Sequence, residues 1–124
     1  MAAKDQLGAR GEDIATRELL GLGWSVLARN WRPTPGRGLP RGELDIVAQD
    51  GGELVVVEVK TRSTTAFGGA IEAVTRAKLA RLRRLAAAWL ASQDRRFDGV
   101  RVDVVCIDIG RDGLPRVEIL RGVE

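Results

Sequence analysis

The sequence predicts an α/β protein in the order αβββαββ, a central mixed sheet flanked by helices. Three observations predict it. Apolar residues recur at helical spacing in two separate stretches, a two-residue turn joins two apolar strands near residues 51–52, and a β-branched run follows the second helical stretch. The 124 residues contain no internal repeat and no apolar run of the about 18 residues that span a bilayer. We therefore expect a single domain over residues 1–124.

The first predicted helix runs from Lys4 to Leu22, where apolar residues recur every three or four positions and Gly23 is placed as a stop. Gly8 and Gly11 lie inside it, each at a cost of about 1 kcal/mol relative to alanine. Two glycines at such positions indicate a close approach to another element, with a frayed first turn as the alternative.

The second predicted helix is opened by Gly68 and Gly69 and runs to about Ala91, with an apolar stripe along one face. Five stretches are predicted as strands from their β-branched and aromatic content and from the turns between them. They are Trp24–Trp31, Glu43–Gln49, Leu54–Thr61, Arg101–Ile109 and Arg116–Leu120. A loop rich in proline, glycine and arginine joins the first two of these strands over residues 33–42.

The turn between the second and third strands fixes a register. If Asp50 pairs with Glu53 across a two-residue turn, Asp45 faces Glu58 and Glu43 faces Lys60, and these four side chains share one face. The opposite face then carries an apolar set suited to packing under a helix. Its members are Leu44, Ile46, Val55, Val57 and Val59.

The composition restricts the chemistry. The chain has no histidine, no tyrosine and a single cysteine, Cys106, so Ser-His-Asp catalysis, Cys/His zinc sites and tyrosine strand transfer are excluded. Acid–base or metal chemistry must come from Asp, Glu and Lys, and such oxygen ligands favour Mg²⁺ or Mn²⁺. The net charge of +3 and the pI of about 9.7 agree with a polyanionic partner.

The polar face of the hairpin predicts a site. Like charges that face each other across strands are destabilising, so Asp45 and Glu58 need a positive charge between them. A divalent cation there, with Lys60 beside it, suits phosphodiester hydrolysis. The alternative is a solvated face with Glu43 and Lys60 as an exposed ion pair. The strand over residues 54–59 is apolar enough to be buried, which favours the site.

These residues resemble a known signature. Asp45 followed by Glu58-Val59-Lys60 is similar to the Asp…Glu-x-Lys motif of restriction-endonuclease-like nucleases, including archaeal Holliday junction resolvases. More closely, the chain resembles the YraN family of small bacterial proteins assigned to that fold. The motifs that carry this resemblance are Gly11-Glu12, Arg29-Asn30, Gly42–Ala48, Val57–Arg62, Phe67-Gly68, Glu72–Val74, Lys78 and Arg81-Leu82.

The resemblance implies a role for each matched residue. Asp45 and Glu58 would be metal ligands, Val59 would add its backbone carbonyl, and Lys60 would be the catalytic lysine. Glu12 would approach the metal from the first helix, directly or through water, or else be a solvated charge. Glu43 would be an accessory acid. Leu44 stands where the founding nuclease motif has proline, and the loop before it is longer than usual.

Basic residues near these positions predict where a substrate lies. Lys78 and Arg81, early on the second helix, would hold phosphates beside the site, and Arg41 with Arg62 would form a second phosphate contact. The alternative for both pairs is that the charges only face water. Trp24 and Trp31, two of the three tryptophans, are expected on opposite faces of the sheet, in a core or an interface.

We therefore expect a metal-dependent nuclease that acts on DNA with little sequence preference. The resemblance also implies a homodimer, since resolvases of this fold cut two strands. The alternatives are a nucleic-acid-binding or assembly protein that keeps the fold without catalysis, and a protein whose acidic face serves a protein partner. We expect a cytoplasmic location and no membrane, because the N-terminus lacks an apolar signal segment.

Overall fold

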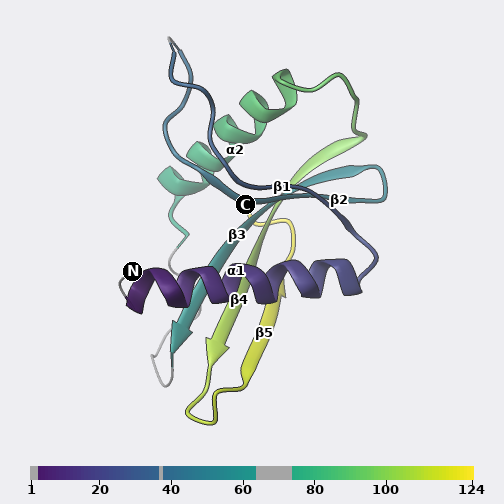
Figure 1. Cartoon of the computed structure of the whole chain (residues 1–124). Helices are drawn as coiled ribbons and strands as arrows, with labels where there is room; N and C mark the ends of the chain where they lie inside the picture. The colour runs from purple at the N-terminus through teal and green to yellow at the C-terminus, as the bar shows by residue number, and fades with distance from the viewer. Residues whose placement is uncertain (1–2, 37, 64–73) are drawn as a thin grey trace.

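The predicted order of elements is confirmed. The computed structural model describes residues 3–36, 38–63 and 74–124, with side chains from Gln6 onward. Its elements are α1 (Ala3–Gly21), β1 (Ser25–Trp31), β2 (Leu44–Asp50), β3 (Glu53–Ser63), α2 (Arg76–Ala91), β4 (Gly99–Ile109) and β5 (Pro115–Leu120) (Figure 1). None of the described helices is long and apolar enough to cross a membrane.

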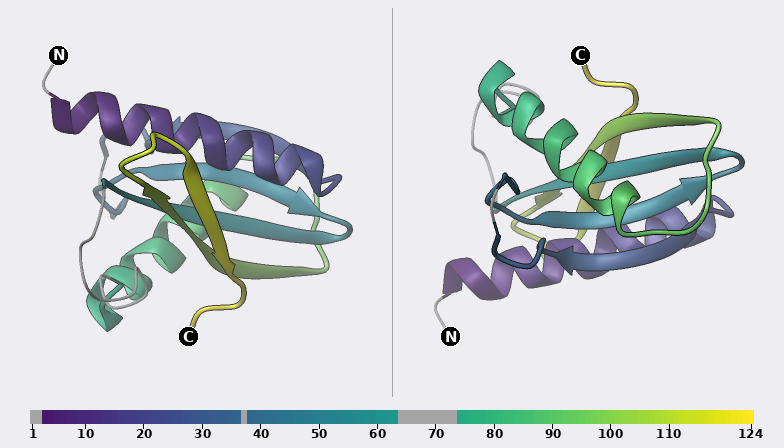
Figure 2. Two further views of the ribbon diagram at one scale, coloured as in Figure 1. Left: turned by 90° about the horizontal axis from the view of Figure 1, so that it is seen from below. Right: turned by 90° about the horizontal axis from the view of Figure 1, so that it is seen from above.

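The strands form one five-stranded mixed sheet in the order β1-β2-β3-β4-β5. β3 and β4 run parallel, and the other neighbouring pairs are antiparallel. The long connection between the two parallel strands contains α2, as parallel pairing requires. Figure 2 shows α1 on one face of this sheet and α2 on the other.

Each face of the sheet buries its own apolar cluster. Under α1 the cluster joins Ile14, Ala15 and Leu19 to inward-facing residues of β2, β3 and β4. Under α2 it joins the buried helix residues Leu79, Leu82, Leu85, Ala86 and Trp89 to the alternate residues of the same strands. Trp24 belongs to the first cluster and Trp31 packs against the second, so the two tryptophans lie on opposite faces as expected.

The predicted hairpin register is confirmed from Asp50↔Glu53 to Ile46↔Val57. Leu44 is an exception to the predicted faces, because it packs in the α2 cluster rather than with Ile46 under α1. The cause lies on the neighbouring strand. Asn30 has a left-handed φ of 51°, so the usual alternation fails there and the paired residues Trp31 and Leu44 turn to the α2 face.

The second helix begins later than predicted, as the described residues show. Val74 and Thr75 precede α2, which starts at Arg76, while the predicted opening at Gly68 and Gly69 lies outside the described residues. Thr75 is extended, and its hydroxyl accepts a hydrogen bond from the Lys78 backbone N–H at 3.1 Å. This N-cap fixes the first turn of α2, and with it the position of Lys78.

Candidate metal centre

The predicted site lies where β2 and β3 separate. The β2–β3 ladder ends at Ile46↔Val57, and at the next position the Asp45 carboxylate takes the place of a backbone partner. Its Oδ2 accepts a hydrogen bond from the Val59 backbone N–H at 2.9 Å. The gap between the strands therefore holds a carboxyl group, which the predicted register places opposite Glu58. The two side chains are in fact hydrogen-bonded to each other.

Three carboxylates converge at this point from three elements. Glu12 of α1, Glu43 before β2 and Asp45 of β2 each offer an oxygen, and these oxygens lie within 4.8 Å of one another. All three residues are half-buried. Glu12 and Asp45 are predicted ligands, and the structure brings them together. Glu43 is more central than the accessory role expected for it, and Glu58 joins the cluster through Asp45 rather than directly.

Glu12 reaches the cluster because α1 comes very close to β3. Gly11 is buried, and a Cβ at this position would overlap the side chain of Thr61. Gly8 has nothing within 4 Å of such a Cβ, so the expected close approach holds for Gly11 alone. The side chain of Asn30 hydrogen-bonds Glu12, and the Arg29 guanidinium lies 3.9 Å from it. Asn30 has the left-handed backbone conformation described above, which asparagine tolerates better than most residues.

The prediction that Glu43 faces Lys60 was wrong, because Glu43 pairs with Arg32. Its Oε2 lies 2.7 Å from Arg32 Nη2 and accepts a hydrogen bond from Arg32 Nε at 2.8 Å. The register calculated from the turn does not extend this far, because the ladder has already ended at Ile46. Arg32 is the first residue after β1, so the strand that carries Asn30 also supplies the cation for Glu43.

Glu58 is the buried acid of the site, with 6% of its surface exposed. The ion pair that it makes is with Lys78 of α2, whose Nζ lies 2.9 Å from Glu58 Oε2. This oxygen is closed to solvent, and it receives no hydrogen bond of good geometry within the described part of the chain. Lys60 acts on Glu58 through its charge. The lysine in ion-pair contact with the predicted ligands is therefore Lys78.

Burial disfavours the ionised form of two carboxyl groups in the cluster, Asp45 and Glu12. Burial, followed by the hydrogen bond and the charge of Glu58, raises the pKa of Asp45 to about 8. Burial likewise raises the pKa of Glu12. For Glu58, burial is outweighed by the hydrogen bond from Asp45 and by Lys78, so its pKa lies below the usual value. At neutral pH Asp45 is thus mainly protonated and donates its hydrogen bond to Glu58.

Glu43, Asp45 and Glu58 line a cavity of about 310 Å³ between β2, β3 and α2, and Glu12 lies outside its lining. Arg81 and Lys78 stand on its α2 side, as predicted, with Leu82 and Leu85 below them. Gly42 closes it from the loop, at a φ of 124° and with Leu85 3.2 Å from the position of a Cβ. A larger residue at 42 would hold the loop away from the helix.

The remaining predicted phosphate contacts lie apart from this cavity. Arg41 is exposed in the loop, where it lines a neighbouring hollow that shares Gly42 and Glu43 with the site. Arg62 lies further along β3, paired in register with Asp108, and lines a separate depression beside β4 and β5. The structure therefore places Arg41 next to the site and Arg62 away from it.

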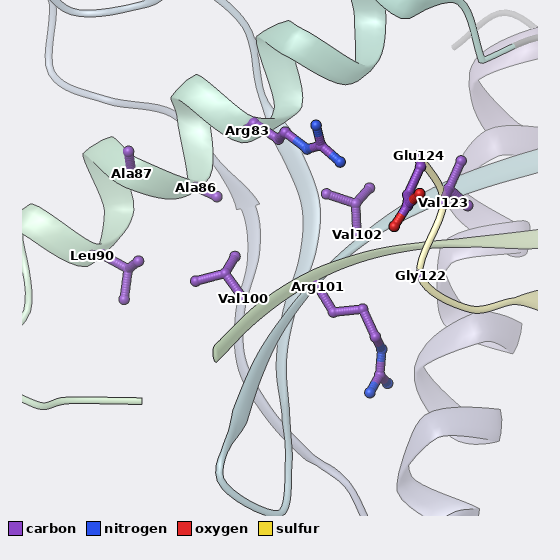
Figure 3. Close-up of a pocket in the computed structure, with 10 residues that line it drawn as sticks. All are labelled: Arg83, Ala86, Ala87, Leu90, Val100, Arg101, Val102, Gly122, Val123 and Glu124. Atoms are coloured by element: carbon purple, nitrogen blue, oxygen red, sulfur yellow. The ribbon is translucent and has the colours of Figure 1, made fainter. Parts of the chain in front are cut away.

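A more apolar depression of about 320 Å³ lies between α2, the start of β4 and the C-terminus. Its walls include Ala86, Leu90 and Val102 (Figure 3). Figure 3 shows the Arg101 side chain on the opposite side of its strand from Val100 and Val102. This side chain forms ion pairs with Asp50, Glu53 and Asp103. This hollow shares no lining residue with the cavity that holds Asp45 and Glu58.

The residues of the carboxylate cluster fit a hard divalent cation. Such ions take carboxylate and carbonyl oxygens, and all the candidate donors here are of these types. Burial and the neighbouring Glu58 raise the pKa of Asp45, so an added cation would stabilise the ionised form of this carboxyl group. Mg²⁺ and Mn²⁺, the expected ions, match this donor set.

Fold and site together define an α/β protein with an acidic centre at the open end of a β-hairpin and a lysine entering from the following helix. The chain belongs to the uncharacterised protein family UPF0102, whose profile matches residues 11–107 and which is the YraN-type family that its motifs resemble. A UPF0102 protein of Beutenbergia cavernae is 58% identical over 99% of both chains. Another, from Mycolicibacterium vanbaalenii, is 49% identical over 98% of this chain and 95% of its own.

Four residues that shape the site were not predicted as functional. Asn30 and Arg32 hold Glu12 and Glu43, Gly42 brings the loop against α2, and Thr75 caps α2. Asn30 and Gly42 stand in the motifs that carry the family resemblance, which was the available signal. Thr75 is an ordinary N-cap residue three positions before Lys78, a spacing that could have located the helix start.

Proposed function

We propose that this protein is a nuclease that depends on Mg²⁺ or Mn²⁺ and hydrolyses phosphodiester bonds of DNA with little sequence preference. The observation that carries the proposal is the convergence of Glu12, Glu43 and Asp45 within 4.8 Å beside two cations of α2. Carboxylate oxygens at this spacing could serve together as ligands of one divalent cation. The family resemblance, through Asp45 and Glu58-Val59-Lys60, supports the same activity.

Each residue of the candidate site would have a separate role in the reaction. Asp45, Glu12 and Glu43 would hold the ion, with Glu58 and the Val59 carbonyl completing the ligand set. When bound, the ion neutralises the phosphate and lowers the pKa of a water molecule. Lys60 either orients and deprotonates that water or stabilises the developing charge. Both roles need the ammonium close to Glu58, where its charge acts.

Substrate recognition would rest on backbone phosphates. Lys78 and Arg81 line the cavity, and Arg41 stands on the adjoining loop. Such contacts position a strand without reading its bases. The predicted preference is therefore for the shape of the nucleic acid, and binding should weaken as salt concentration rises.

The test is cleavage of a labelled panel by purified protein with Mn²⁺, with Mg²⁺ or with EDTA. The panel holds single-stranded DNA, duplex, flap, four-way junction and RNA. Wild-type protein should cut at least one DNA only with metal, and Asp45→Asn should abolish cutting. The fold should survive, because the amide group that this substitution introduces can still donate a hydrogen bond to Glu58, as protonated Asp45 does.

Asp94→Asn is the matched control, an exposed aspartate beyond the end of α2. It should cut like wild type. Equal cutting by Asp45→Asn and wild type would mean contamination and would contradict the proposal. Absence of cutting by folded wild-type protein on every substrate would contradict it as well.

One observation favours a second candidate, a nucleic-acid-binding protein without catalysis. α2 contains five basic residues and no acidic one, and several of its arginines are exposed on the outer face. This basic helix can bind a polyanion without the carboxylates. Binding that needs no metal, survives Asp45→Asn and weakens when Lys78 and Arg81 are neutralised would favour this candidate, provided that no cleavage is seen.

A further inference from the structure

The cation in ion-pair contact with the buried acid Glu58 belongs to α2, whereas the cations paired with Glu12 and Glu43 are Arg29 and Arg32. Lys78 Nζ lies 2.9 Å from Glu58 Oε2, and the charge of Glu58 acts on this ammonium. Its side chain is 30% exposed while that of Glu58 is 7% exposed. The lysine therefore enters the buried acid's pocket from a side that remains open to water.

The backbone of Lys78 is held in place at the start of α2, whereas its side chain is long and unbranched. Thr75 caps the first turn of α2, and Leu79 and Leu82 anchor the helix in the core. The lysine side chain has four rotatable bonds and can carry its ammonium several ångströms without moving the helix. Glu58 lacks this freedom, because it lies on the central strand β3 between β2 and β4.

We propose that the Lys78 ammonium is the resident counter-ion of this acidic cluster and that a divalent cation binds by displacing it. The inference rests on the proposed metal centre and not on cleavage. The ion would take over the enclosed Glu58 Oε2, which lies 2.9 Å from the Lys78 ammonium. The released ammonium stays in the cavity beside Arg81, where it meets a phosphate. Lys78 thus restrains metal binding and serves the substrate.

The test is the affinity for Mn²⁺, measured by isothermal titration calorimetry on metal-free protein at a fixed pH. Lys78→Met keeps the length of the side chain and removes the competing charge. If the ion pair is populated more than nine-tenths of the time, its loss should tighten Mn²⁺ binding about tenfold or more. Arg84→Met is the matched control, because it removes a positive charge from the exposed side of the same helix. Its affinity should match that of wild type.

A second measurement is the thermal midpoint with EDTA and with Mn²⁺. Without metal, Lys78→Met leaves Glu58 buried and unpaired, so its midpoint should fall below that of wild type. Mn²⁺ should raise the midpoint of Lys78→Met by more than it raises that of wild type. Lys78→Gln, which keeps a polar head group, should behave alike if the methionine variant folds poorly.

The outcomes separate the two proposals. Wild-type binding of Mn²⁺ with no gain in Lys78→Met over Arg84→Met would overturn the counter-ion role while leaving the metal centre standing. No Mn²⁺ binding by wild type or by either Lys78 variant would overturn both. Tighter Mn²⁺ binding together with slower cleavage in Lys78→Met would support both, because the same lysine would then be missing from the phosphate.

Discussion

The two ends of the β2–β3 hairpin both gather carboxylates around a basic side chain, but they differ in how well directed hydrogen bonds satisfy those carboxylates. At the turn end, Arg101 of β4 lies 3.2 Å from Asp50, 3.1 Å from Glu53 and 2.9 Å from Asp103. Asp103 is fully buried, and it also accepts a hydrogen bond from the Gly122 backbone N–H at 2.9 Å. Every bond at this end is short and directed.

The open end shows the opposite balance. Four carboxyl groups cluster there, Asp45 holds a proton to about pH 8, and the ion pair of Glu58 is with a flexible ammonium. Arginine offers a rigid fork of donors that satisfies several oxygens at once, whereas lysine offers a mobile point charge. The hydrogen bond to Asp103 is the main reason that the pKa of Arg101 is raised, so this guanidinium stays charged. The comparison indicates a structural network at one end and a site poised for a ligand at the other.

The largest expected effect comes from a substitution that removes Arg101 from the turn-end network. Arg101→Met should lower the free energy of unfolding by about 3–5 kcal/mol, because it leaves the buried Asp103 without its cation. Urea denaturation measures this loss. Arg121→Met is the control, since Arg121 also stacks on Trp24, at 5.4 Å, but makes none of the ion pairs found among the described residues.

The control should lose no more than about 1 kcal/mol, the value of an exposed cation–π contact. Equal losses in both variants would mean that Asp103 does not depend on Arg101.

Asp45→Asn at the open end should not destabilise the protein at neutral pH, because it replaces a carboxyl group that is already largely neutral.

The next effect is a pH dependence at the open end. The pKa of Asp45 is about 8 in the folded protein and about 3.8 in the unfolded chain, so between these values the folded state binds more protons. Stability from this group is therefore complete below pH 4 and falls as pH rises toward 8, by at most about 1.4 kcal/mol per pH unit. Glu58 acts oppositely, losing stability only as pH falls below its usual pKa.

Urea denaturation in EDTA at pH 5.5, 6.5, 7.5 and 8.5 measures this slope. The wild-type protein should lose stability steadily over the series, and Asp45→Asn should lose much less. Saturating Mn²⁺ should flatten the wild-type curve, because a bound cation replaces the proton. A wild-type slope that Asp45→Asn leaves unchanged would show that another group is responsible.

How far the sequence predicts this fold depends on how local each signal is. The segment Asp50-Gly51-Gly52-Glu53 sets the hairpin register by itself, so the contact of Asp45 with Glu58 follows from the turn and the two-residue period of the strands alone. The face of Leu44 does not, because it depends on a left-handed residue, Asn30, on another strand. Alternation is a property of regular strands and carries no information past an irregular residue.

The distinction between local and long-range signals also applies to the residues of the site. The strand pairing predicted that Asp45 lies opposite Glu58, and the family motif predicted that Glu12 belongs to the site. The ion pairs of Glu43 with Arg32 and of Glu58 with Lys78 depend on how a loop and a helix dock against the sheet. No spacing along the chain encodes that docking. Lys78 was predicted to lie beside the site, but the acid that it contacts follows from tertiary packing.

The smallest expected effect concerns how α1 delivers Glu12 to the open end. Gly11→Ala would force a Cβ into the Thr61 side chain, so α1 must move away from β3. We expect a loss of about 1–3 kcal/mol in the free energy of unfolding, typical of overpacking. Mn²⁺ affinity should fall as well, because Glu12 follows Gly11 directly.

Gly8→Ala is the matched control on the same helix, since nothing lies within 4 Å of its added Cβ. It should stabilise the protein by up to about 1 kcal/mol through helix propensity and leave Mn²⁺ affinity unchanged. Combining Gly11→Ala with Thr61→Ala should restore part of both losses, because the side chain that the new methyl group meets is removed. If the double variant binds Mn²⁺ no better than Gly11→Ala alone, the contact with Thr61 is not what positions Glu12, and the open end is assembled without help from α1.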